Sequence, residues 1–200
     1  MQPFRVTELT LEQVRDAYAG LIVPAFPENE LKPLRRIEAA LRRGKYLCYG
    51  AVAAGDALGA AFFARTGREG RTLQLFDYLV VRPELRCRGI GGAFLRALID
   101  GPLRDAGAVL LEVDDPDRAD DPGEHALRRR RLMFYLRNGL YDTGARATVY
   151  GVAFRILALP GNETIAPDQA REMYAALYRS IFPPHTYRHR VTIEGPDPSP

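Results

Sequence analysis

The chain has 200 residues, 46% of them hydrophobic, and 28 basic residues against 25 acidic ones, which gives a formal net charge of +3. This length and apolar content predict one globular domain, alone or with a modest appendage. Two cysteines are too few for a disulfide-stapled scaffold, and no apolar run approaches the roughly 18–20 residues of a membrane span. The start of the chain has no signal-peptide pattern, so we expect a cytoplasmic protein without a membrane partner.

Arginine carries almost all of the positive charge. Lysine occurs only at Lys32 and Lys45, so the other 26 basic residues are arginines. The small net charge does not require a nucleic-acid partner, and we expect none. Composition bias is the simplest interpretation of the arginine excess. The alternative is that some arginines hold phosphate or carboxylate groups in a forked geometry.

The first half of the chain predicts two helices and several strands. A short strand is expected at residues 4–6, followed by a helix at 11–21 that is capped by Thr10. Residues 24–33 contain three prolines and interrupt the pattern, and a second helix is expected at 34–43. Three apolar strands, joined by glycine-containing turns, are then predicted at 46–53, 58–66 and 73–81.

The second half alternates helices and strands, which predicts a mixed α/β sheet. Helices are expected at 89–106, 125–137 and 168–181, and strands at 108–113 and 148–159, with a further short strand near Leu140. The last helix belongs to a C-terminal helical extension over 161–194, packed on a main domain over 1–160. The proline-rich residues 195–200 are expected to form a disordered tail.

Residues 79–92, with the sequence LVVRPELRCRGIGG, join the end of a strand, a basic glycine-rich loop and the start of a helix. The unpaired N–H groups and the dipole of a helix N-terminus attract anions, and Arg86 and Arg88 add positive charge. The loop has no Gly-Lys-Ser/Thr ending, which excludes a P-loop. Phe94 breaks the dinucleotide fingerprint G-x-G-x-x-G, which argues against a Rossmann fold.

Two motifs resemble the GNAT N-acetyltransferase superfamily. The run R-x-x-G-x-G that begins at Arg86 is similar to the family's acetyl-CoA pyrophosphate loop, and the run F-Y-x-x-x-G-L that begins at Phe134 is similar to its F-Y-x-x-x-G-F segment, with Leu140 in place of the usual phenylalanine. The predicted order of elements fits the family from about residue 4 to residue 159. The resemblance implies a GNAT-type central mixed sheet, mostly antiparallel and flanked by helices.

The resemblance also implies acetyl-CoA as the co-substrate. Its pantetheine arm would lie along the strand 79–81, and its pyrophosphate would sit on the N–H groups of 86–92. The cofactor-binding residues expected on this basis are Leu79, Val80, Val81, Arg86, Cys87, Arg88, Gly89, Ile90, Gly91 and Gly92.

The acceptor amine would attack the thioester directly in a ternary complex. The resemblance makes Tyr135 the proton donor to the departing thiolate, although a tyrosine beside Phe134 is also an ordinary packing residue. A primary ammonium has a pKa of about 10.4 and must first lose its proton, so a base is useful. Glu112, in the apolar strand 108–113, and Asp77 are the candidate bases, and either is alternatively a structural partner of an arginine.

The acidic stretch 112–124 and the following arginine run, Arg128 to Arg131, are expected on a loop and a helix. The acidic stretch lacks the spacing of a calcium loop, so we interpret it as a solvated loop, with attraction of a cationic amine as the alternative. Four consecutive arginines on a helix fan over about 300°. At least one should therefore turn toward the sheet and pair with Glu112 or Asp114.

The acceptor site, by resemblance, is built from the first two helices and their connection. Phe26, Glu28 and Glu30 would line it and favour a cationic amine, while an ordinary acidic helix start is the alternative. The three histidines show no metal-ligand or triad spacing, so no metal site is expected.

The predicted function is an acetyl-CoA-dependent N-acetyltransferase acting on a primary amine of a small molecule or peptide. The alternative is a GNAT-like acyl-CoA-binding regulatory module without turnover. The identity of the amine, the preference for acetyl-CoA over a longer acyl-CoA and the oligomeric state, including a homodimer, stay open at the level of sequence.

Overall fold

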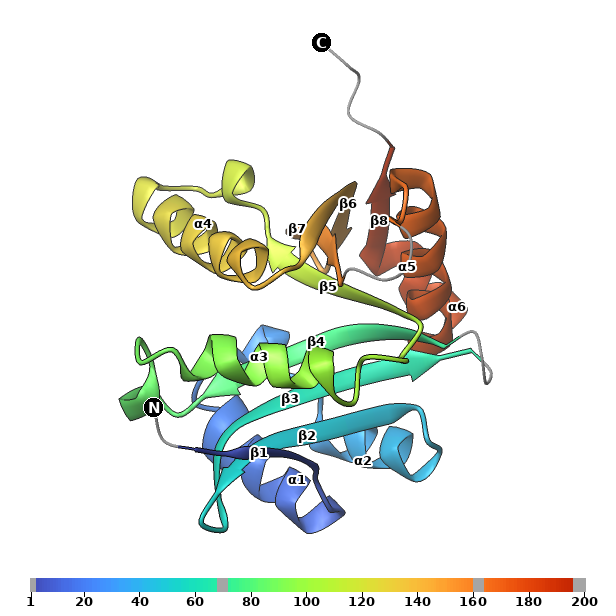
Figure 1. Ribbon diagram of the computed structural model, residues 1–200. Helices are drawn as coiled ribbons and strands as arrows, with labels where there is room; N and C mark the ends of the chain where they lie inside the picture. The colour runs from blue at the N-terminus through green and yellow to red at the C-terminus, as the bar shows by residue number, and fades with distance from the viewer. Residues whose placement is uncertain (1–2, 68–71, 160–163, 196–200) are drawn as a thin grey trace. The chain divides into compact units, whose positions relative to one another are not determined.

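The structure is a computed structural model that describes residues 3–67, 72–159 and 164–195 (Figure 1). The described residues form two compact units, the first within 1–65 and 76–105 and the second within 66–75 and 106–200. Together they contain six α-helices and eight β-strands, which confirms the predicted α/β class. No helix in the described part of the chain is both long and apolar enough to cross a membrane.

The first unit consists of antiparallel strands and three helices. Its elements are β1 (Arg5–Glu8), α1 (Leu11–Ala17), α2 (Leu34–Arg42), β2 (Tyr46–Ala53), β3 (Asp56–Thr66), most of β4 (Leu73–Val81) and α3 (Ile90–Asp100). Strand β1 pairs with β2 and β2 pairs with β3, both antiparallel. Seven consecutive residues of β3 are buried, 58–64, so this strand is covered on both faces. The core of the unit therefore lies on both sides of β3.

The start of α1 was predicted correctly because the residues that cap it can be recognised in the sequence. Thr10 caps the helix and accepts a hydrogen bond from the backbone N–H of Gln13, while the Gln13 side chain accepts one from the backbone N–H of Thr10. This reciprocal capping box satisfies two N–H groups that a helix start leaves unpaired. The predicted helix 11–21 is present as α1 followed by a π-helical turn, Tyr18–Ile22.

The second unit is a set of antiparallel strands in the order β5-β7-β6-β8 with three helices. Its elements are β5 (Ala108–Asp114), α4 (Pro122–Arg137), β6 (Tyr141–Val149), β7 (Val152–Ala158), α5 (Pro167–Ile181), α6 (Pro184–Arg190) and β8 (Val191–Glu194). Helix α4 begins earlier than predicted because Asp121 caps it, with Pro122 in its first turn.

The prediction of one strand over 148–159 is wrong. The chain reverses at Tyr150 and Gly151, whose φ angles of 50° and 85° form a two-residue turn between β6 and β7. Such turns usually carry Asn or Asp at the first position, and a tyrosine there conceals the turn within an apolar run. The predicted helix 89–106 is also too long, because α3 ends at Asp100.

The C-terminal extension contains α5 as predicted, together with α6 and the strand β8, which were not predicted from the sequence. The division of the chain at residue 160 stays a prediction. The turn expected at 67–70 and the tail expected at 195–200 lie outside the described residues, except for Gly67 and Gly195.

Candidate functional site

The glycine-rich loop after β4 forms an exposed turn that leads into α3. A short 3₁₀ turn, Pro83–Leu85, follows the strand, and residues 86–89 are exposed. Gly89 is the residue before α3; its φ of 79° is left-handed, and no side chain caps the helix. The N–H groups of the first turn of α3 thus have no capping side chain competing for them, at the positive end of the helix dipole.

The space in front of this turn is open. A Cβ atom built on Gly89 would meet no atom within 4 Å, so a ligand can approach the backbone there. Cys87 and Arg88 are exposed beside it, while the Nε of Arg86 donates to the Val81 carbonyl at 3.1 Å. The turn therefore combines backbone donors with two arginines, as the sequence predicted for an anion site.

The remaining predicted cofactor residues lie on either side of this turn. Leu79 and Val81 of β4 are half-buried, and Val80 between them is buried. Ile90 and Gly92 are buried and anchor the start of α3 in the core. The structure thus places all ten predicted residues in one continuous strand–turn–helix segment of the first unit.

Asp77, the second candidate base, is already paired. Its side chain is 8% exposed; Oδ1 forms an ion pair with the Nζ of Lys32, and Oδ2 accepts a hydrogen bond from the hydroxyl of Tyr46. The alternative of an arginine partner is wrong for Asp77, because one of the two lysines of the chain takes that place. Burial and the neighbouring Asp77 carboxylate hold the pKa of Tyr46 well above its usual value, so Tyr46 remains a donor.

Tyr78 holds the connection between the first two helices against β4. Its hydroxyl donates to the Glu30 carbonyl and accepts from the Lys32 backbone N–H, both at 2.8 Å. The Phe26 ring packs edge-on against the Tyr78 ring at 5.0 Å between centroids. The hydroxyl of Tyr18 donates to the Lys32 carbonyl at 2.8 Å. Two of the predicted acceptor-site residues, Phe26 and Glu30, are thus brought to β4, while Glu28 is exposed.

Asp77 and Tyr78 interrupt the alternation of β4. Neighbouring residues of a regular strand point to opposite faces, yet both of these side chains contact Lys32. The Phe62 ring lies edge-on to both Tyr46 and Tyr78, which places these two phenols on one face of the strands. A carboxylate and a phenol therefore lie side by side on the face that segment 26–32 covers.

Glu112, the first candidate base, lies on β5 in the second unit and contacts two tyrosines of α5. Its Oε1 accepts hydrogen bonds from the hydroxyl of Tyr174 and from that of Tyr178, the latter at 2.5 Å. Tyr174 is fully buried, and burial with the nearby Glu112 keeps its pKa well above the usual value. These two phenols are the described contacts of Glu112, and its pairing with an arginine of the run 128–131 stays a prediction.

One arginine of the run 128–131 points toward the sheet, as the spacing of the run predicted. Arg131 forms an ion pair with Asp114 at the end of β5, which confirms the second of the two expected partners. Arg128 pairs with Glu124 at 2.7 Å and donates to the Asp115 carbonyl at 3.0 Å. Two of the four arginines thus tie α4 to the end of β5 and to the loop that follows it.

Tyr135, the predicted proton donor, is on α4 and is 8% exposed. Its ring packs edge-on against Phe134 at 5.2 Å, so part of the packing interpretation is correct. The hydroxyl forms no hydrogen bond with any described residue, and burial raises the pKa of Tyr135 to about 12. It therefore retains its proton at neutral pH, as a donor must.

Four residues of these clusters were not predicted from the sequence: Lys32, Tyr46, Tyr174 and Tyr178. The three tyrosines occupy apolar positions of a strand and a helix, where a hydrophobic pattern does not distinguish a phenol from phenylalanine. Lys32 carried a usable signal, because lysine is so rare in this chain. Among the described residues, no group of three or more His, Cys, Asp or Glu side chains could hold a metal ion.

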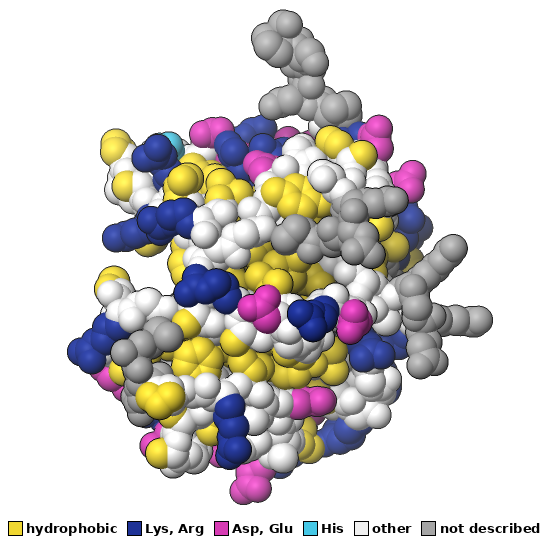
Figure 2. Space-filling view, viewed as in Figure 1, with side chains coloured by type: hydrophobic (Ala, Val, Ile, Leu, Met, Phe, Trp, Pro, Cys, Tyr) yellow, Lys and Arg dark blue, Asp and Glu magenta, His cyan; other side chains and the backbone are white. Residues whose placement is uncertain are grey.

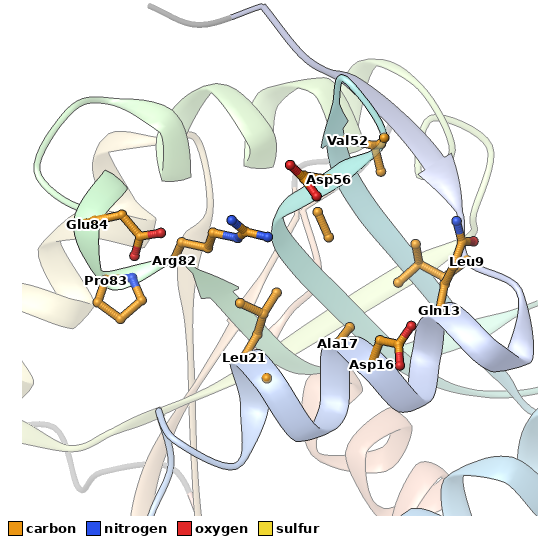
Figure 3. Close-up of a pocket in the computed structure, with 13 residues that line it drawn as sticks. Leu9, Gln13, Asp16, Ala17, Leu21, Val52, Asp56, Arg82, Pro83 and Glu84 are labelled. Atoms are coloured by element: carbon orange, nitrogen blue, oxygen red, sulfur yellow. The ribbon is translucent and has the colours of Figure 1, made fainter.

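The first unit also has a surface groove of about 390 Å³ beside the anion loop (Figure 3). Helix α1, the turn between β2 and β3, and the residues after β4 form its walls. Charged side chains of both signs line it, namely Asp16, Asp56, Arg82 and Glu84. Basic and acidic side chains are similarly interspersed on the face drawn in Figure 2. The charges of the groove thus favour no single class of ligand.

Comparisons with known proteins match the chain by fold. No protein-family model and no curated protein sequence matches it. A protein from Bacteroides thetaiotaomicron assigned to the GNAT acetyltransferase family superposes with a TM-score of 0.66 at 18% identity, over 88% of this chain and 98% of that one.

Two further solved structures are similar over most of their length. An aminoglycoside 6'-N-acetyltransferase complexed with coenzyme A has a TM-score of 0.59 at 17% identity, over 79% of this chain and 99% of that one. The ribosomal-protein-S18-alanine N-acetyltransferase from Escherichia coli has a TM-score of 0.54 at 20% identity, over 79% and 94%. At such identities the likeness establishes the fold: the chain has the fold of the GNAT acetyltransferases.

Proposed function

We propose that the chain is an acetyl-CoA-dependent N-acetyltransferase that acetylates a primary amine. The observation that carries the proposal is the uncapped start of α3 behind an exposed turn with two arginines. Structures with this fold include one complexed with coenzyme A and one with acetyl-CoA bound. The cytoplasmic location expected from the sequence stays a prediction.

The residues after β4 fit the diphosphate of acetyl-CoA. The N–H groups of the first turn of α3 would bind its oxygens, and Arg86 and Arg88 would neutralise its charge. Residues 79–81 would hold the pantetheine arm through their backbone. When bound, acetyl-CoA supplies the thioester, and this chain supplies the binding groups, the proton donor and the attraction for the amine.

The chain offers one proton donor and two carboxylates for the chemistry. Tyr135 would protonate the leaving thiolate, since its raised pKa keeps the phenol neutral across the physiological range. Asp77 and Glu112 are the candidate proton acceptors for the amine. Each already accepts hydrogen bonds from tyrosine, and Asp77 also pairs with Lys32, so either must exchange a partner to act.

The acceptor is proposed to be a cationic amine that reaches segment 26–30. Phe26 would contact its apolar part, and Glu28 and Glu30 would attract its charge. Solved structures of this fold include acetyltransferases of aminoglycosides, of spermidine and of the alanine of a ribosomal protein, all of which carry amines.

Thermal unfolding with and without acetyl-CoA tests the cofactor. A ligand that binds only the folded state must raise the Tm, and the shift should grow with ligand concentration. Arg88→Glu, which places a negative charge beside the bound diphosphate, should reduce the shift, whereas Arg5→Glu at an exposed position of β1 should leave it unchanged. If acetyl-CoA at concentrations far above micromolar does not move the Tm, the proposal is wrong.

A panel of amines, assayed for release of CoA thiol, then tests turnover. Faster release of CoA thiol in the presence of at least one primary amine supports the proposed enzymatic function. Binding of acetyl-CoA without release of thiol for any amine supports the alternative, a regulatory module that binds acyl-CoA.

A further inference from the structure

The two lysines of the chain have very different surroundings. Lys45 is exposed at the turn before β2. The side chain of Lys32 is 26% exposed, and its ammonium pairs with Asp77 of β4. In a chain with 26 arginines, an arginine at this position could supply the same charge, but its guanidinium does not become a nucleophile under physiological conditions. The distinctive property of lysine here is an amine that can react once it loses a proton.

The Lys32 amine lies beside the strand proposed to hold the cofactor. Asp77 precedes Leu79 by two residues, which is about 7 Å along a strand. Going back along β4 from the anion turn, the pantetheine segment 79–81 comes first, and the position of Asp77 and Lys32 follows. With its diphosphate at the anion turn, the reactive end of acetyl-CoA would point in this direction, because the two lie at opposite ends of the arm.

The backbone around Lys32 is fixed on both sides. Its N–H donates to the Tyr78 hydroxyl and its carbonyl accepts from the Tyr18 hydroxyl, each at 2.8 Å. The side chain therefore starts from a held position and ends on a held carboxylate. Such positioning converts an encounter between two molecules into a reaction within one complex.

We propose that Lys32 is a self-acetylation site of this protein. The inference rests on the proposed binding of acetyl-CoA and adds a product, the chain's own acetyl-lysine. The ammonium of Lys32 loses a proton to Asp77, and the neutral Nζ attacks the thioester carbonyl carbon. The N–C bond forms and the C–S bond breaks, with its electron pair staying on sulfur. The second proton lost from nitrogen passes to the thiolate, so the products are the amide and CoA thiol.

The experiment incubates the full-length protein with isotopically labelled acetyl-CoA and follows each lysine by peptide mass spectrometry. Lys45 is the internal control, because chemical acetylation by acetyl-CoA in solution favours the exposed lysine. We expect Lys32 to be labelled at least about tenfold faster than Lys45, since positioning provides the advantage. The rate constant at Lys32 should not depend on protein concentration, and excess unlabelled CoA should suppress labelling at Lys32 but not at Lys45.

Lys32→Arg is the matched variant. It keeps a positive charge beside Asp77 and should remove the fast labelling, while the Tm shift with acetyl-CoA persists. Labelling of Lys32 no faster than Lys45, or labelling insensitive to CoA, overturns self-acetylation. If the Tm of the unmodified protein does shift in that case, the cofactor proposal still stands, and if it does not, both proposals fail.

Discussion

At the scale of single residues, breaking the ion pair between Asp77 and Lys32 should lower the free energy of unfolding. Lys32→Met leaves an 8% exposed carboxylate with only the Tyr46 hydroxyl as a polar partner of those described. We expect a loss of about 1–3 kcal/mol in the free energy of unfolding, below the value for a fully buried pair because Lys32 is partly exposed. Urea unfolding measures it.

The double variant Lys32→Met with Asp77→Asn provides the control. Because the amide carries no charge, the pair of substitutions should cost less than the sum of the two single ones. Strict additivity would show that the ion pair contributes nothing to stability.

Tyr135 makes the sharpest catalytic prediction. Tyr135→Phe keeps the ring that packs on Phe134 and removes only the hydroxyl, so acetyl-CoA affinity should hardly change while kcat falls about 100-fold. With a pKa of about 12, the phenol is still protonated at pH 10, so its ionisation should not limit kcat of the unmodified protein below that pH. Steady-state kinetics against a fixed amine measure both, and an unchanged kcat would exclude Tyr135 as the acid.

At the scale of elements, α5 is tied to β5 by two phenols that share one carboxylate oxygen. Tyr174→Phe removes one buried donor without opening a cavity, and Glu112 keeps Tyr178. We expect a loss of about 1–2 kcal/mol for this single change. The double change with Tyr178→Phe should cost more than either single change, because Glu112 then loses both phenols. Denaturant midpoints measure the three variants, and Tyr150→Phe on the exposed turn is a neutral control.

The elements that sequence predicted best are those with a local signature. Thr10 and Gln13 mark the start of α1 within one turn, and R-x-x-G-x-G marks the start of α3. The β6–β7 turn was missed because Tyr150 looks like part of an apolar strand. The cap at Asp121 was overlooked because the acidic stretch around it was interpreted only as a loop.

The site was predictable only where its parts are close in the chain. The anion turn was found because its residues are consecutive. Helical geometry limits where four arginines can point, which predicted that at least one of them would pair with Glu112 or Asp114, and Arg131 does pair with Asp114. The partners of Glu112 lie 62 and 66 residues further along, and those of Asp77 lie 45 and 31 residues earlier. Such pairs depend on tertiary packing, which a single sequence does not reveal.

At the scale of the whole molecule, buried tyrosines predict instability in alkali. Burial is the largest cause that raises the pKa of Tyr46, Tyr78, Tyr135 and Tyr174. In the unfolded chain these phenols ionise near pH 10, so the unfolded state loses protons first. Their contribution to the free energy of unfolding is therefore fully present below about pH 10 and is lost as the pH rises above it.

Urea unfolding between about pH 8 and about pH 11 measures this effect against tyrosine ionisation followed by absorbance. Tyr135→Phe removes one of these phenols. The free energy of unfolding should therefore fall less steeply with pH, by the contribution of one group. A free energy that stays constant up to about pH 11 would contradict the burial of these hydroxyls.

The exposed turn before α3 has a consequence for how such a sequence can diverge. The proposed binding groups are backbone N–H groups. Binding therefore depends on the backbone conformation of the turn more than on the identity of each side chain. Cys87 and Gly89 have φ angles of 59° and 79°, and only the glycine adopts this conformation without the usual cost of about 1–2 kcal/mol. Neighbouring positions can therefore tolerate many different side chains, while Gly89 is the position at which substitution should be most restricted.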